Sequence, residues 1–178
     1  MDGRDGIATR KIVVIGYGNT LRGDDGVGQH VAFAVSSWKV PGLTVEAVHQ
    51  LTSDLAEPLS RADLAIFVDA KLAGEPDCVE VRSLEASSTR GTFGHTSDPQ
   101  SLLALASAVF GRHPRAWLVS VPAVDFTLRE GFSANASRGA ADALARVAAL
   151  IDADNQFPNT LSQASFHREG RAGEHDLG

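Results

Sequence analysis

Residues 13–28 read VVIGYGNTLRGDDGVG, and this stretch decides the fold. It opens as a β-branched apolar run, which is typical of a strand buried on both faces. It closes in a helix pattern, because Val27, Val31 and Val35 recur on one face. The glycine-rich turn between them follows a predicted parallel strand, where open α/β sheets bind ligands. We therefore expect a site at this turn, with Asp24 or Asp25 reaching into it.

The bulk composition narrows the class of protein. The chain has 178 residues, 43% of them hydrophobic, and a formal net charge of -6, which suits one domain. The sequence has no basic stripe that could neutralise phosphates, which argues against a nucleic-acid partner. The single cysteine, Cys78, excludes an internal disulfide, and we expect it to pack as a small hydrophobic residue. No apolar run reaches the roughly 20 residues of a spanning helix, so we expect a cytoplasmic protein without membrane contact. A monomer is the default expectation for its oligomeric state.

Strand and helix patterns alternate along the chain. Strands are predicted at 11–16, 43–49, 64–68, 78–84 and 117–121, and helices at 26–38, from 52 or 53, at 98–110 and at 133–152. Asp98 and Pro99 are typical of a helix start, and Thr52 or Ser53 could cap the short second helix. This order predicts one α/β domain over 11–152, with a mainly parallel twisted sheet of about five strands and helices on both faces. Residues 1–10 are expected to be a flexible leader, and 153–178 a disordered tail.

Three polar side chains follow predicted strands or precede a helix. Asp25 follows the first strand, Asp69 ends the 64–68 strand, and His95 lies in the loop at 85–97. Because parallel strands end at one edge of a sheet, the two aspartates could be neighbours, and His95 could fold over the same edge. Two carboxylates and an imidazole suit a divalent transition metal. Without a metal, the paired aspartates could instead share a proton and activate water.

Structural interpretations compete with these. An aspartate in a strand-end turn commonly bonds nearby backbone N–H groups, and we prefer this reading for Asp24. For Asp25 the two readings are balanced, and His95 taken alone is more often an ordinary loop residue. A dinucleotide site is the weaker option, because Gly16-x-Gly18 lacks a third glycine at the right spacing and the aspartates would face a pyrophosphate. We expect no nucleotide cofactor.

The combination resembles the hydrogenase maturation proteases, the endopeptidases that trim the C-terminus of the large-subunit precursor of [NiFe] hydrogenases. The principal motif is Gly16-x-Gly18-Asn19-x-Leu21-x-x-Asp24-Asp25-Gly26-x-Gly28. The resemblance continues through His49-Gln50-Leu51-Thr52, Ala62-Asp63, Phe67-Val68-Asp69-Ala70, Gly94-His95 with Pro99 and Leu102-Leu103, and Val121-Pro122 to Gly131-Phe132-Ser133. It covers roughly residues 11–152.

The resemblance implies a HybD-like, phosphorylase/hydrolase-like fold and an endopeptidase of aspartic type or with metal-dependent recognition. It places the metal-binding and catalytic set on Asp25, Asp69 and His95, with Asp25 where many members have Glu. The metal would be nickel already held by the precursor, which is the expected partner. Substrate contacts are expected from Gly18, Asn19, Arg22 and His49, with the Gly18 and Asn19 N–H groups steadying an oxyanion. A nickel-binding chaperone or sensor with the same ligands is the alternative.

Overall fold

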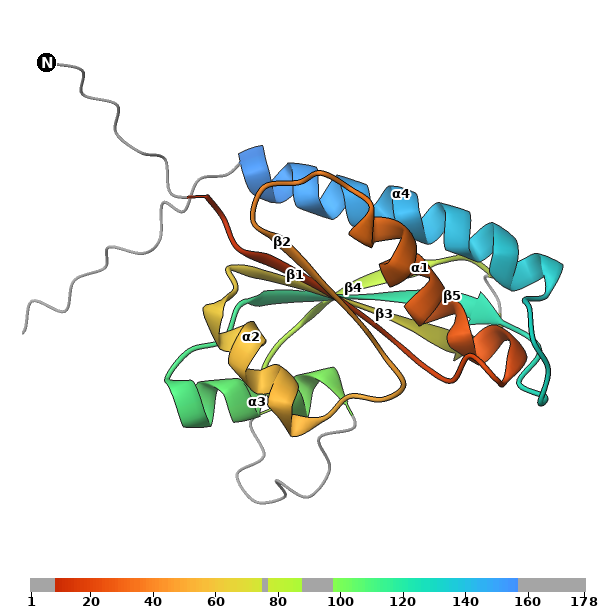
Figure 1. The fold of residues 1–178 in the computed structure, drawn as a ribbon, viewed down its shortest axis with the longest axis horizontal. Helices are drawn as coiled ribbons and strands as arrows, with labels where there is room; N and C mark the ends of the chain where they lie inside the picture. The colour runs from red at the N-terminus through yellow and green to blue at the C-terminus, as the bar shows by residue number, and fades with distance from the viewer. Residues whose placement is uncertain (1–8, 75–76, 88–97, 157–178) are drawn as a thin grey trace, which may run out of the picture.

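The computed structural model describes residues 9–74, 77–87 and 98–156 (Figure 1). The strands are β1 (Ile12–Tyr17), β2 (Leu43–Val48), β3 (Leu64–Leu72), β4 (Glu80–Leu84) and β5 (Arg115–Ala123). The helices are α1 (Val27–Ser36), α2 (Ala56–Arg61), α3 (Pro99–Phe110) and α4 (Ala134–Gln156), with short 3-10 turns η1 (Gly23–Gly26) and η2 (Ser53–Leu55).

One five-stranded sheet in the order β2-β1-β3-β5-β4 organises the chain. β1, β2, β3 and β5 are mutually parallel, and β4 is an antiparallel edge strand. The predicted fold class is confirmed. Cys78 is exposed, contrary to the prediction that it packs, because β4 begins only at Glu80. No helix in the described part of the chain is long and apolar enough to cross a membrane.

Helices cover both faces of the sheet, with α1 and α4 on one face and α2 and α3 on the other (Figure 1). Side chains alternate between faces along each strand. On the α1 and α4 face the sheet contributes Val14, Ile66 and Val119 to one apolar cluster. On the α2 and α3 face it contributes Ile15, Phe67 and Leu118 to a second cluster. The same alternation decides to which face of the sheet the polar residues near the carboxyl ends of the strands belong.

The third strand is longer than predicted. β3 pairs with β5 through Asp69↔Ser120 and onward to Leu72↔Ala123. Asp69 therefore lies inside the strand and does not end it. The strand extends because the backbone N–H and C=O groups beyond Val68 find hydrogen-bond partners on β5. The apolar run at 64–68 gave no sign of this extension.

The last helix also runs past its predicted end at residue 152, to Gln156. Asp154 is buried there and forms ion pairs with Arg10 and Arg115. A buried carboxylate is tolerated when cations pair with it, so the polar sequence misled the prediction. The remaining residues of the predicted leader and tail, 1–8 and 157–178, lie outside the described residues.

Two helix starts were predicted to be capped. The Asp98 carboxylate accepts a hydrogen bond from the Ser101 amide at 3.0 Å, with Pro99 at the first position of α3, as predicted. Thr52 holds the capping position of η2, but its side chain makes no capping bond. The short helix there is instead held by apolar packing of Leu55 and Leu59.

Candidate functional site

Asp69 and Tyr17 are neighbours on adjacent strands. The parallel register pairs Gly16 with Val68, so the next residue on each strand, Tyr17 and Asp69, lies side by side. Both belong to the face that α2 and α3 cover, because they alternate with residues facing α1 and α4. The Tyr17 hydroxyl donates a hydrogen bond to the Asp69 carboxylate.

The turn after β1 brings Asp25 to the same edge. Gly18 has φ +130, and a Cβ there would overlap the Asp25 carbonyl oxygen. Gly28 is equally tight, because its Cβ would overlap the carbonyl oxygens of Tyr17 and Val68. These two glycines let the backbone of η1 and α1 approach the ends of β1 and β3 directly. The motif glycines thus have a spatial reason: they place Asp25 beside the strand that carries Asp69.

The charge of Asp25 acts on the Asp69 carboxylate. Burial and, to a smaller extent, the charge of Asp25 together raise the pKa of Asp69 to about 6, against hydrogen bonds from Tyr17 and the Ala70 amide that lower it. Burial, and then the charge of Asp69, raises the pKa of Tyr17. A carboxylate whose pKa lies near neutrality can both accept and return a proton, which is the requirement for general acid and base catalysis.

Asp24 has a structural role, as the sequence led us to prefer. Its buried carboxylate accepts hydrogen bonds from the amides of Val124 (2.9 Å), Asp125 (3.1 Å) and Ser133 (2.6 Å), and from the Ser133 hydroxyl (2.7 Å). Burial disfavours the charged form, but these bonds outweigh it and lower the pKa of Asp24. The partners lie a hundred residues away along the chain, so Asp24 fastens the loop between β5 and α4 to the turn after β1.

The backbone N–H and the side chain of Asn19 both have partners within the turn. Its backbone N–H donates to Asp25 Oδ2 at 2.9 Å, and its side-chain Oδ1 accepts from the backbone N–H of Leu21 at 2.9 Å. The backbone N–H of Asn19 therefore orients Asp25 in the free chain, and its predicted contact with a substrate oxyanion stays a prediction. The Gly18 carbonyl accepts from the Gln29 side chain at 2.6 Å.

Of the remaining predicted site residues, Arg22 and His49 lie at the carboxyl edge of the sheet, and one falls in residues 88–97, which the structure does not describe. Arg22 is exposed, and its Nε donates to the Phe126 carbonyl at 3.2 Å. His49 is exposed immediately after β2, whose last residue pairs with Tyr17, so it lies at the same edge. His95 lies outside the described residues. Within 9–74, 77–87 and 98–156, no three His, Cys, Asp or Glu side chains form a metal-binding group.

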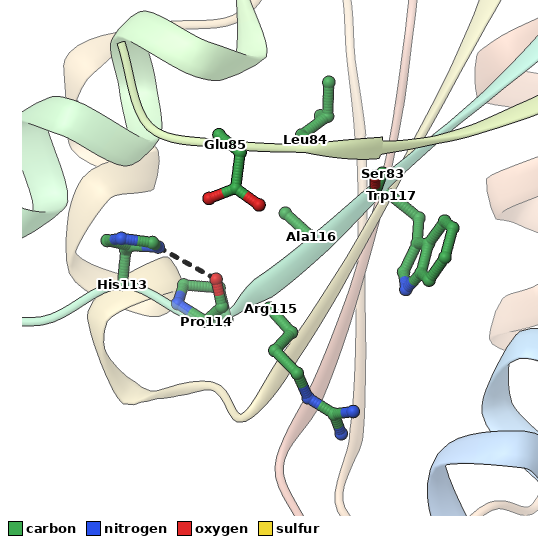
Figure 2. A pocket seen from close by; sticks show the side chains of 8 residues that line it. All are labelled: Ser83, Leu84, Glu85, His113, Pro114, Arg115, Ala116 and Trp117. Atoms are coloured by element: carbon green, nitrogen blue, oxygen red, sulfur yellow. Dashed lines mark hydrogen bonds between the residues drawn. The ribbon is translucent and has the colours of Figure 1, made fainter. Parts of the chain in front are cut away.

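The cavity in Figure 2 belongs to a different part of the molecule. It has a volume of 290 Å³ and lies between the end of β4, at Leu84 and Glu85, and the start of β5, at Arg115. Asp69 pairs with Ser120, towards the other end of β5. In the cavity wall, His113 Nδ1 bonds the Pro114 carbonyl at 2.9 Å. The cavity therefore lies at the opposite edge of the sheet from Asp25 and Asp69.

Two polar residues of the site were missed from the sequence. Tyr17 was treated only as part of the turn, and buried Ser120, the register partner of Asp69, was not singled out. The available signal for Tyr17 was its position at the end of the first apolar run, since the second apolar run ends at Asp69 and two parallel strands end at the same edge of a sheet. Its use required the strand register, which sequence patterns did not supply.

Comparisons with known proteins support the fold. No family model matches this sequence, and no curated protein matches it. The hydrogenase maturating endopeptidase HybD from E. coli matches with a TM-score of 0.61 and 20% identity, over 80% of this chain and 93% of that chain. The [NiFe] hydrogenase maturation protease HycI from Thermococcus kodakarensis KOD1 matches with a TM-score of 0.62 and 22% identity, over 82% and 95%.

A third solved structure, the hydrogenase 2 maturation peptidase from Thaumarchaeota archaeon SCGC_AB-539-E09, has a TM-score of 0.58 and 22% identity, over 80% of this chain and 98% of that chain. This chain therefore has the fold of the hydrogenase maturation proteases. The resemblance that the sequence motif indicated is confirmed at the level of the fold.

Proposed function

We propose that this chain is a hydrogenase maturation protease, an endopeptidase that removes a C-terminal peptide from the nickel-loaded precursor of a [NiFe]-hydrogenase large subunit. The observation that carries the proposal is the placement of Asp25 and Asp69 at the same carboxyl edge of the sheet, where the charge of one acts on the other, in the fold of proteins named as these endopeptidases. In open α/β sheets this edge is where ligands bind.

Asp69 is the proposed general base. It takes a proton from a water molecule, whose oxygen attacks the scissile carbonyl, and it returns the proton to the departing amine, so that the peptide bond gains one water. Its pKa of about 6 leaves most of the carboxylate charged at neutral pH, yet close enough to neutrality to release the proton again. Tyr17 holds the Asp69 side chain, and the Asn19 amide holds Asp25.

Nickel enters as part of the substrate. Asp25 and Asp69 are proposed to contact the ion carried by the precursor, with His95 as the third ligand, a set that suits a divalent transition metal. Asp98, at the start of α3, acts electrostatically on Tyr17. His95 is three residues from Asp98, which corresponds to at most about 10 Å of extended chain. A proposed role for His95 beside the aspartates is therefore compatible with the chain length.

The test is to incubate the purified chain with nickel-loaded precursor and to measure the intact mass of the large subunit. A shortened subunit supports the proposal. Asp69→Asn and Asp25→Asn should abolish shortening, whereas the control Asp142→Asn, an exposed carboxylate on α4, should preserve it. An unchanged mass with transferred nickel would favour the chaperone alternative, and an unchanged mass without transfer would reject both functions.

A further inference from the structure

Exposed apolar side chains gather at the carboxyl edge of the sheet. They are Leu21 (62% exposed), Leu72 (75%), Val124 (55%) and Leu128 (84%), which we call the apolar rim. Leu21 comes from the turn after β1, Leu72 ends β3, and the other two lie in the loop after β5. Single exposed apolar residues are ordinary, but a group on converging segments is typical of an interaction site.

Backbone hydrogen bonds join the segments of the rim. The Arg129 amide donates to the Leu21 carbonyl at 3.1 Å, next to Leu128. The Ala73 amide donates to the Ala123 carbonyl at 2.8 Å, which ties the residue after Leu72 to the residue before Val124. The rim segments are therefore neighbours in two pairs, Leu21 with Leu128 and Leu72 with Val124, and the loop after β5 contributes one residue to each pair.

The loop that carries half of the rim is held in place by a buried charge. Asp24 receives four hydrogen bonds from the loop and from Ser133, which ends it. An isolated bridge between Arg22 and Arg129 adds a second attachment. A surface that is already ordered pays less conformational entropy when a partner binds. A fixed loop that presents an almost fully exposed leucine is therefore suited to docking.

At least one part of the rim, Leu72, lies on the opposite face of the sheet from Asp69. Leu72 alternates with Asp69 along β3, so it belongs to the face covered by α1 and α4, whereas Asp69 belongs to the face of α2 and α3. A short peptide lying at Asp69 has no reason to touch Leu72. A substrate whose body rests on the rim while its tail crosses the edge would contact both.

Two arginines beside the rim indicate what charge a partner surface should carry. Arg129 pairs with Asp125 at 2.9 Å. Arg22 is exposed, and within the part of the chain that the structure describes no carboxylate pairs with it. A partner surface that covers the rim would therefore be complementary if it placed an acidic side chain against Arg22.

We propose that the apolar rim is the docking surface for the folded body of the protein substrate, which presents an apolar patch flanked by an acidic residue. This inference rests on the proposed function and names the recognition surface of the same site. Its partner is the precursor itself, because the rim lies at the same carboxyl edge of the sheet as the carboxylates that must reach the scissile bond. A second copy of this chain is the competing occupant.

The experiment compares two double variants. Leu21→Ser with Leu128→Ser removes rim residues that are 62% and 84% exposed, and the control Val109→Ser with Phe33→Ser removes residues that are 61% and 75% exposed on α3 and α1. We expect the rim variant to raise KM for the nickel-loaded precursor by at least about tenfold while kcat changes less than about twofold. The control variant should leave both values unchanged.

A binding measurement separates this inference from the proposed function. The dissociation constant for the precursor, measured by biolayer interferometry in an Asp69→Asn background, should also rise about tenfold in the rim variant. If the wild type does not cleave but the rim variant binds more weakly, only the proposed function fails. An unchanged dissociation constant, or an equal loss in the control, overturns the docking surface whatever the cleavage result.

Two further readouts address folding and self-association. Arg22→Glu, with Arg138→Glu on α4 as its control, weakens precursor binding without removing any apolar side chain, so it tests the same surface if the serine variant unfolds. Light scattering measures the mass of the wild type. A dimer that the rim substitutions dissociate, with precursor binding unaffected, would assign the rim to a second copy and refute the proposal.

Discussion

Replacing Asp69 by asparagine is expected to stabilise the folded protein at neutral pH even though it removes the proposed general base. Burial makes the charged form of Asp69 unfavourable in the folded state. Asparagine has nearly the same shape and keeps an oxygen that can accept the hydrogen bond from the Ala70 amide, which is 2.8 Å long with Asp69. It carries no charge, so the folded state no longer bears the cost of the buried carboxylate.

The size of the effect follows from the pKa. A rise from 3.8 to about 6 corresponds to about 3 kcal/mol as an upper limit, at roughly 1.4 kcal/mol per unit. Because the side chain is partly exposed, solvent screening reduces the expected gain to about 1–2 kcal/mol. The folded pKa of Asp69 is raised, so its stabilising contribution is present below pH 3.8 and is lost as the pH rises through about 6. The advantage of asparagine therefore grows between these two pH values.

The assay is urea denaturation of wild type and variant at about pH 4 and pH 7.5, with a chelator present. The difference in unfolding free energy between the two proteins is compared across pH, because other carboxylates change the stability of both proteins alike. Asp142→Asn serves as the control and should show no such growth. A difference that is the same at both pH values, or that shrinks as the pH rises, would refute the argument that Asp69 is strained by burial.

Three further outcomes are expected. Asp25→Asn should lower the midpoint of a carbon-13 NMR titration of the Asp69 carboxyl below about 6, because the charge of Asp25 contributes to the raised pKa; an unmoved midpoint would show that the two groups do not interact. Asp24→Ala should destabilise the fold by about 3–5 kcal/mol in urea denaturation, since four neutral donors lose their acceptor; the wild-type contribution should disappear only in acid below pH 3.8, because the pKa of Asp24 is lowered. Asp154→Asn should cost about 2–4 kcal/mol by weakening the ion pairs that hold the end of α4, and a loss below 0.5 kcal/mol would contradict their role.

Local periodicity was enough to predict most of the elements. The apolar run at the start of the chain, the helix beginning at Asp98 and the alternation of β4 each depend on residues within one turn or one strand. The same holds for the tight turn after β1, whose glycines the sequence showed, whereas the site expected at this turn stays a prediction. The structural reading of Asp24 was also correct, although its partners could not be named from the sequence.

The site depended on pairings between distant segments. Tyr17 meets Asp69 only because β1 and β3 are adjacent and in register, and a shift of one residue would place them on opposite faces. The end of α4 was missed because Arg10 and Arg115, far away in sequence, make the burial of Asp154 possible. His95 lies outside the described residues, and its role stays a prediction.

The sequence by itself determined the order of strands and helices along the chain and the tight turn with its acidic residues, because these depend on interactions between near neighbours along the chain. Only the tertiary structure decided that the charge of Asp25 acts on Asp69, that Asp24 fastens a loop a hundred residues away, and that four exposed apolar side chains lie at the carboxyl edge of the sheet. Such effects depend on burial and on the register of strands. Both arise from packing between distant segments, and neither is encoded in any single stretch of sequence.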